Sequence, residues 1–122
     1  MTLLQRPRVF AVAGLALAGV ALTAAAVRSQ GQVREFTVSG HDHAFSPARI
    51  EVQKDDLVKI TFTASDIAHS FTVDSYRIAK RAGAGQTVVF EFRADQPGTF
   101  TYYCNLTADD KCKQMKGALV VR

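Results

Sequence analysis

The sequence lacks several patterns that would indicate particular classes of protein. After residue 28, apolar residues do not recur with a sustained helical period, which argues against a helical domain. No basic stripe with interleaved aromatic residues is present, so the sequence gives no support for nucleic-acid binding. Paired carboxylates, a nucleophile–base pair and an open substrate site cannot be recognised either, and we therefore expect a protein that is not an enzyme.

The first 27 residues differ from the rest and are predicted to direct export. Arg6 and Arg8 precede an uncharged apolar run over residues 9–27, and its end, Ala24-Ala25-Ala26, offers a small-residue cleavage site. The run is also long enough for an uncleaved membrane anchor, since about 18 apolar residues can span a bilayer. We favour a cleaved signal peptide. With either a signal or an anchor helix, residues 28–122 form one extracytoplasmic or periplasmic domain.

Removal of residues 1–27 weakens the basic character of the chain. The formal net charge falls from +4 to +2, because Arg6 and Arg8 are lost while all 11 acidic residues remain. The domain keeps both cysteines and all three histidines. In an exported protein two cysteines form a disulfide by default, so any metal site must be weighed against that outcome.

Short alternating segments at regular spacing predict an all-β domain. In the strongest segment, 57–63, Val58, Ile60 and Phe62 share one face. Similar runs cover 33–39, 50–52, 69–73, 87–93, 100–103 and 118–121, which predicts about seven strands in an antiparallel or mixed β-sandwich. Gly40 is expected to end the first strand. Residues 74–84 are expected to form a long connection, in which a helical turn is an option.

The stretch from Phe100 to Val121 contains a candidate metal loop. An aromatic-rich strand ends at Cys104, and a polar loop then carries Cys112 and Met115 before the last apolar run. Thiolate and thioether sulfurs are soft donors that suit Cu(I), zinc or iron–sulfur centres. A metal-binding loop and a Cys104–Cys112 disulfide are the two alternatives.

The order of these motifs resembles the cupredoxin family. The residues that resemble its front half are Phe45-Ser46-Pro47, Val58–Phe62 and Ala68-His69-Ser70-Phe71, and those that resemble its back half are Pro97–Cys104 and Met115–Val121. From about Phe36 onwards, the chain is most similar to the copper A domain of cytochrome oxidase subunit II and its small soluble relatives. The resemblance implies a Greek-key β-sandwich that binds copper and transfers electrons.

The resemblance also implies ligands, and here the chain departs from the pattern. His69 and Cys104 match the family's first histidine and first cysteine. Copper A loops carry a second cysteine four positions after the first, a histidine eight after it and a methionine eleven after it; those positions hold Ala108, Cys112 and Met115 here. The second bridging thiolate is therefore missing, and we expect a mononuclear rather than a binuclear site.

His43 is the candidate for the missing imidazole. It lies two residues before Phe45, so on extended backbone both side chains point to one side. The predicted metal ligands are thus His69, Cys104, Cys112, Met115 and His43, with copper preferred and zinc left open. Met115 can alternatively be a core methionine, whereas His41 is expected to be solvated and Asp66 to be a turn residue.

These donors predict a one-electron carrier with a non-standard His/Cys/Cys/Met copper site. The alternatives are Cu(I) delivery, storage or sensing, since two thiolates and a thioether favour Cu(I), and a metal-free β-sandwich with a disulfide. Lys111, Lys113 and Lys116 surround the loop. They either keep the protein soluble or steer an acidic redox or copper-trafficking partner.

Overall fold

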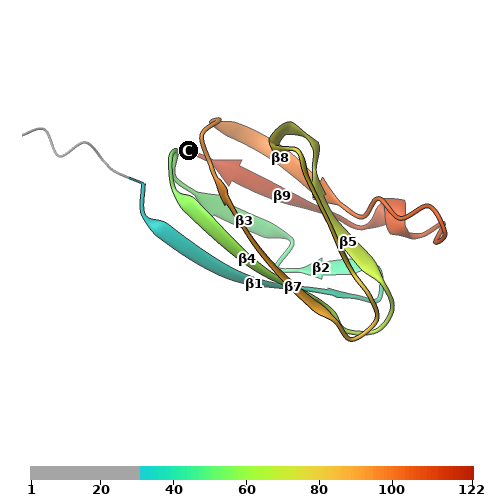
Figure 1. Ribbon diagram of the computed structural model, residues 1–122. Helices are drawn as coiled ribbons and strands as arrows, with labels where there is room; N and C mark the ends of the chain where they lie inside the picture. Colours follow the sequence, from blue (N-terminus) through green and yellow to red (C-terminus); the bar gives the residue numbers. More distant parts are fainter. Residues whose placement is uncertain (1–30) are drawn as a thin grey trace, which may run out of the picture.

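The structure is a computed structural model that describes residues 31–122, and these residues form a sandwich of two β-sheets (Figure 1). The strands are β1 (Val33–His41), β2 (Ala44–Ser46), β3 (Arg49–Val52), β4 (Leu57–Ala64), β5 (His69–Val73), β6 (Ile78–Ala82), β7 (Thr87–Arg93), β8 (Gly98–Tyr103) and β9 (Lys116–Val121). Two 3-10 helices, η1 (Asp74–Tyr76) and η2 (Cys112–Gln114), interrupt the connections.

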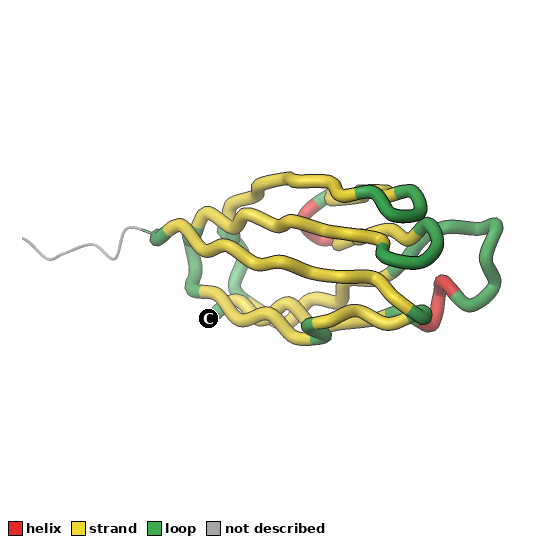
Figure 2. Tube along the Cα trace, turned by 90° about the horizontal axis from the view of Figure 1, so that it is seen from below, coloured by secondary structure: helices red, strands yellow, loops and turns green. Residues whose placement is uncertain are grey.

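The two sheets are mixed, and Figure 2 shows them as two layers. One sheet has the strand order β2-β1-β4-β7 and the other β3-β9-β8-β5-β6. β1 pairs with β4 and β3 pairs with β9 in parallel, while the remaining pairs are antiparallel. The predicted all-β mixed Greek-key sandwich is therefore confirmed.

The signal or anchor helix predicted over residues 1–27 lies outside the described residues. In the part of the chain that the structure describes, no helix is long and apolar enough to cross a membrane.

The core lies between the sheets and contains a cluster of aromatic rings. Alternate residues of β4 point inward, and Val58, Ile60 and Phe62 are fully buried, as the sequence pattern predicts. Phe71 of β5 stacks on Tyr102 of β8 with ring centroids 4.7 Å apart. Offset stacking of this kind adds to the hydrophobic stabilisation that burial of the rings supplies. The stacked pair holds β5, which begins with the candidate ligand His69, beside β8, which is followed directly by the candidate ligand Cys104.

Two sequence-based expectations about the strands are wrong. Gly40 does not end β1, which continues through His41. Gly40 leaves space there for the His69 ring, since a Cβ atom at this position would make tight contacts of 3.0–3.2 Å with ring atoms of His69. β6 was expected to be a connection. It has no alternating pattern, since only its ends, Ile78 and Ala82, are buried, and it lies at the edge of the five-stranded sheet.

Gly117 of β9 leaves room for the side chain of Tyr102 on the neighbouring strand β8. It pairs with Tyr102 in the antiparallel β8–β9 ladder, and a Cβ atom at position 117 would lie 2.1 Å from a ring atom of that tyrosine. The tyrosine ring cannot move away easily, because its hydroxyl donates to the Pro47 carbonyl at 2.8 Å and its face stacks on Phe71. The ring therefore occupies the space that a side chain at position 117 would need.

We predict that Gly117→Ala destabilises the fold by about 1–3 kcal/mol, the usual cost of inserting a methyl group into a packed core. Urea unfolding of the purified protein measures this value. Gly83→Ala is the matched control, because its Cβ would meet only the end of the flexible Gln86 side chain, and it should change stability by less than about 0.5 kcal/mol. Equal stability losses in the two variants would contradict the packing described for Tyr102.

Candidate metal centre

The five predicted ligands gather at one end of the sandwich. The loop between β8 and β9 projects from the end opposite to the start of β1 (Figure 1). The first residue of β5, His69, and the turn between β1 and β2, which holds His43, lie at this same end. A hydrogen bond joins β5 directly to the loop: the Ser70 hydroxyl accepts from the Asn105 backbone N–H at 2.7 Å.

His69 is fully buried and has one unpartnered ring nitrogen. Its Nε2 lies 2.7 Å from Oδ1 of Asp66, whereas its Nδ1 has no hydrogen-bond partner among residues 31–122. An ionised carboxylate can only accept, so Nε2 carries the proton and a neutral ring keeps a lone pair on Nδ1. A buried polar atom without a partner is costly and therefore calls for an explanation. A metal ion bound at Nδ1 would provide one.

Backbone hydrogen bonds keep the Asp66 carboxyl ionised. The N–H groups of Asp42 and Ile67 donate to it at 2.7 and 2.8 Å and hold its pKa well below the usual range for aspartate, with a further contribution from His69. Asp66 was expected to be a turn residue, and it does bind the backbone of its own turn. Its contact with His69 was not anticipated.

The two cysteines are bonded to each other in the structure. Cys104 directly follows β8 and Cys112 begins η2; their Cα atoms are 5.1 Å apart, both side chains are fully buried, and the sulfurs form a disulfide. The Leu106 N–H lies 3.1 Å from Sγ of Cys112. This is the alternative that the sequence left open beside metal ligation. Because a disulfide offers no thiolate, ligation by Cys104 and Cys112 stays a prediction for the reduced protein.

Met115 directly follows η2, which begins with Cys112, and directly precedes β9. Its side chain is fully buried, its carbonyl accepts from the Cys104 N–H at 3.3 Å, and its own N–H donates to the Cys112 carbonyl at 3.0 Å. These bonds place Met115 beside both cysteines along the backbone. Burial is expected both for a thioether ligand and for a core methionine, so the two interpretations of Met115 stay open.

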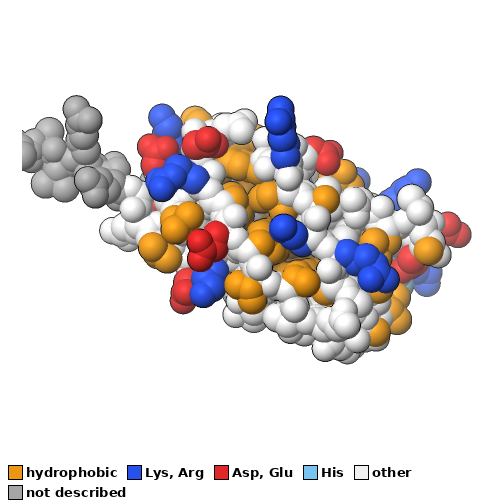
Figure 3. All heavy atoms as spheres, viewed as in Figure 1, with side chains coloured by type: hydrophobic (Ala, Val, Ile, Leu, Met, Phe, Trp, Pro, Cys, Tyr) orange, Lys and Arg blue, Asp and Glu red, His pale blue; other side chains and the backbone are white. Residues whose placement is uncertain are grey.

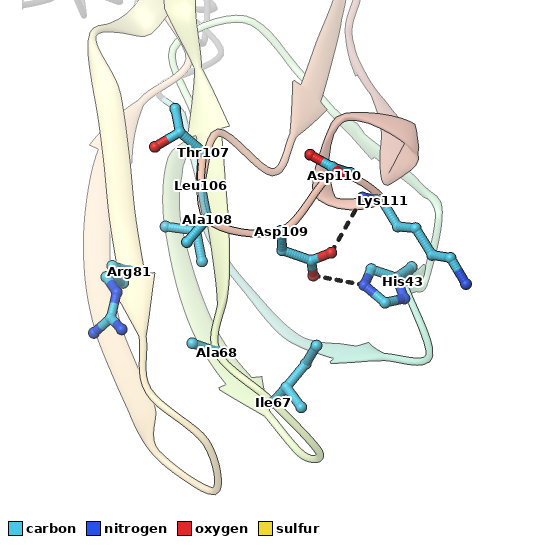
Figure 4. A pocket seen from close by; sticks show the side chains of 10 residues that line it. All are labelled: His43, Ile67, Ala68, Arg81, Leu106, Thr107, Ala108, Asp109, Asp110 and Lys111. Carbon is cyan, nitrogen blue, oxygen red and sulfur yellow. Dashed lines mark hydrogen bonds and ion pairs between the residues drawn. The ribbon is translucent and has the colours of Figure 1, made fainter.

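His43 lies next to His69, although it does so from a turn and not from extended backbone. Its φ is 54°, in the left-handed region, and the two imidazole centroids are 5.7 Å apart with nearly perpendicular planes. The side chain is 23% exposed, and Nε2 lies 2.6 Å from Oδ2 of Asp109 in the loop (Figure 4). This hydrogen bond lowers the pKa of the Asp109 carboxyl. His41 is exposed and turns instead toward Ser65.

As they stand, the side chains do not form a closed metal site. Within residues 31–122, no three His, Cys, Asp or Glu side chains are grouped so that they could share an ion. The donor set nevertheless suits copper or zinc once the disulfide is reduced, since it combines imidazole, thiolate and thioether groups. The unpartnered Nδ1 of His69 is the observation that supports this fit.

An open pocket of about 710 Å³ adjoins the loop, and His43, Ile67, Leu106, Arg81 and Lys111 are among its lining residues (Figure 4). Asp109 and Asp110 also line it, so the pocket carries charges of both signs. The side chains of Lys111 and Lys113 in the loop and of Lys116 at the start of β9 are exposed. The face drawn in Figure 3 shows basic and acidic side chains together at this end of the molecule.

Comparison with known proteins establishes the family. The model of the cupredoxin-like domain matches residues 14–121, so the chain belongs to the cupredoxin-like domain family, as the sequence resemblance predicted.

Several solved structures share the fold. A heme-copper terminal oxidase dimer contains a chain with a TM-score of 0.64 and 15% identity, covering 76% of this chain and 71% of that one. The metal-binding domain of the Cu(I)-exporting P-type ATPase CopA of Streptococcus pneumoniae D39, solved with Cu(I), has a TM-score of 0.64, 19% identity and coverage of 76% and 89%. Auracyanin A, a blue copper protein of Chloroflexus aurantiacus, has a TM-score of 0.62, 18% identity and coverage of 74% and 99%.

We predict that the disulfide contributes about 2–3 kcal/mol to stability, because it closes a loop between residues separated by eight positions. Urea unfolding with and without dithiothreitol measures the difference. The Cys104→Ala/Cys112→Ala variant is the control, since its stability should not respond to the reductant. A wild-type protein that responds no more than this variant would contradict the presence of the bond.

Proposed function

We propose that this chain is an exported cupredoxin that binds copper once its disulfide is reduced and that carries single electrons. The ligands are His69, Cys104, Cys112 and Met115, with His43 as a fifth donor. The observation that carries the proposal is the buried Nδ1 of His69, which lacks a partner within residues 31–122 and lies at the end of the fold where the cysteine loop begins. Copper supplies the one-electron couple when it is bound.

The protein's own groups would hold the ion and exclude water from it. His69, Cys104, Cys112 and Met115 are all fully buried, so four of the five proposed donors are shielded from solvent. His43 alone reaches the surface, at the edge of the pocket beside the loop. Electrons would therefore enter and leave at this end, and the exposed lysines would favour an acidic partner.

Copper binding by both sulfurs requires that the disulfide first be reduced. Two electrons and two protons convert the bond to two thiols, and a dithiol that becomes a disulfide in the same exchange can supply them. The two thiols then lose their protons when they bind the metal. Since exported cysteines tend to oxidise, we expect a dithiol reductant to act before copper is loaded.

A second function rests on the chemistry of the donors. Two thiolates and a thioether are soft ligands that favour Cu(I) over Cu(II). Cu(I) delivery, storage or sensing is therefore the alternative to electron transfer. The two functions differ in whether the bound copper can be oxidised and reduced repeatedly without loss of thiols.

We predict that the reduced protein takes up about one copper ion per chain under anaerobic conditions, whereas the disulfide-bonded protein binds far less. Metal analysis and thiol titration of both forms measure this difference. Mild oxidation should then give thiolate-to-copper absorption and a paramagnetic signal, both reversed by a reductant. A colourless Cu(I) form that loses its thiols irreversibly would favour delivery or storage. If protein whose free thiols have been confirmed by titration takes up no copper, the copper proposal is wrong.

The role of Met115 can be tested by Met115→Leu, which conserves side-chain volume. We predict a stability change of less than about 1.5 kcal/mol, because such exchanges are well tolerated in cores. If the thioether is a weak ligand, the same variant still binds copper but shifts its absorption bands and reduction potential. An unchanged spectrum and potential would assign Met115 to the core alone.

A further inference from the structure

Asp66 connects the two segments that carry the histidines. It lies in the turn between β4 and β5, and its Oδ1 accepts from Nε2 of His69 at 2.7 Å and from the Ile67 N–H at 2.8 Å. Its Oδ2 accepts from the Asp42 N–H at 2.7 Å, in the turn between β1 and β2. One carboxylate thus binds His69 directly and the residue that precedes His43.

The bond to Nε2 determines which nitrogen of His69 is available. Both oxygens of the Asp66 carboxylate accept backbone N–H groups, so the carboxylate is ionised and has no proton to donate to the ring. The ring must therefore be the donor, and in a neutral imidazole the proton lies on Nε2. The lone pair then belongs to Nδ1, which is buried and unpartnered within the described residues. Histidine ligands of metals commonly donate their other N–H to a carboxylate, which fixes the tautomer and the orientation of the ring.

The bond to Asp42 acts on the other imidazole. Asp42 and His43 have φ values of 50° and 54°, two consecutive non-glycine residues in a region that L-amino acids rarely adopt. Such backbone persists only where its surroundings stabilise it. The Asp42 N–H is held by Asp66, and the Ser65 N–H donates to the Gly40 carbonyl at 3.0 Å. The two bonds hold the turn that places the His43 ring 5.7 Å from that of His69.

We propose that Asp66 is a positioning residue for the candidate copper site: it presents Nδ1 of His69 to the metal and holds His43 beside it. The part of this inference that concerns copper rests on the proposed function. The orientation itself is a property of the metal-free protein. A turn residue without this role would leave the histidine tautomer unchanged when it is replaced.

The test is nitrogen and carbon NMR of the imidazole rings in the metal-free, disulfide-bonded protein. In the wild type, His69 should be the tautomer with its proton on Nε2. Asp66→Ala should convert His69 to a mixture that includes the Nδ1–H form and should shift the His43 signals. Asp66→Asn should preserve the tautomer, because its amide oxygen can still accept from Nε2. Asp109→Asn is the matched control, since it alters the partner of His43 and should leave the His69 tautomer unchanged.

Copper titration of the reduced variants gives the second readout. Asp66→Ala should weaken copper binding by about 10- to 100-fold, the usual effect of losing a carboxylate that orients a ligand, and Asp66→Asn should weaken it less. A wild-type His69 with its proton on Nδ1 would overturn the proposal without any variant, which covers the case in which Asp66→Ala does not fold. An unchanged tautomer in folded Asp66→Ala would overturn it too. If the wild-type tautomer is as expected but the reduced protein takes up no copper, the proposed function fails while the orientation of His69 stands.

Discussion

The candidate site depends on one contact between segments that are 35 residues apart in the chain. The Ser70 hydroxyl accepts from the Asn105 N–H and donates to the Asn105 side-chain oxygen, both at 2.7 Å. Each partner follows a proposed ligand, so the contact brings His69 and Cys104 to the same end of the second sheet. Behind it, the stacked rings of Phe71 and Tyr102 anchor β5 against β8. The site is therefore held by the rigid core of the sandwich, as a metal centre with fixed geometry requires.

Because Cys104 and Cys112 form a disulfide, copper binding in the proposed function is thermodynamically linked to the reduction of that bond. Copper that binds only the reduced form stabilises that form, by about 2.7 kcal/mol when free copper is 100-fold above its dissociation constant. For a two-electron couple this corresponds to an increase of about 60 mV in the apparent reduction potential of the cysteine pair. In the proposed function, copper thus protects the thiols against oxidation, and oxidation of the thiols releases copper.

The sequence predicted the fold better than the chemistry of the site. In β4 the alternation of Val58, Ile60 and Phe62 gave the strand and its buried face, because one side of each sheet packs on the core. β6 was not predicted, because its three middle residues are exposed and two of them, Lys80 and Arg81, are charged, so the strand shows no alternating pattern. The positions of His43 and His69 at one end could be expected from family resemblance. The proposed role of Asp66 could not, because it depends on the turn geometry that brings the Asp42 N–H to its second oxygen. Spacing alone also could not decide between a Cys104–Cys112 bond and two thiolate ligands.

If the proposed function is correct, His69 and the cysteine sulfurs bind the same copper ion. X-ray absorption at the copper edge of the anaerobically reduced and loaded protein tests it most directly. We expect sulfur and imidazole scattering from a single copper environment in the wild type, and weaker imidazole scattering in His69→Ala, in which His43 is the remaining proposed imidazole donor. Copper surrounded only by nitrogen and oxygen, or by sulfur with no change in His69→Ala, would contradict it.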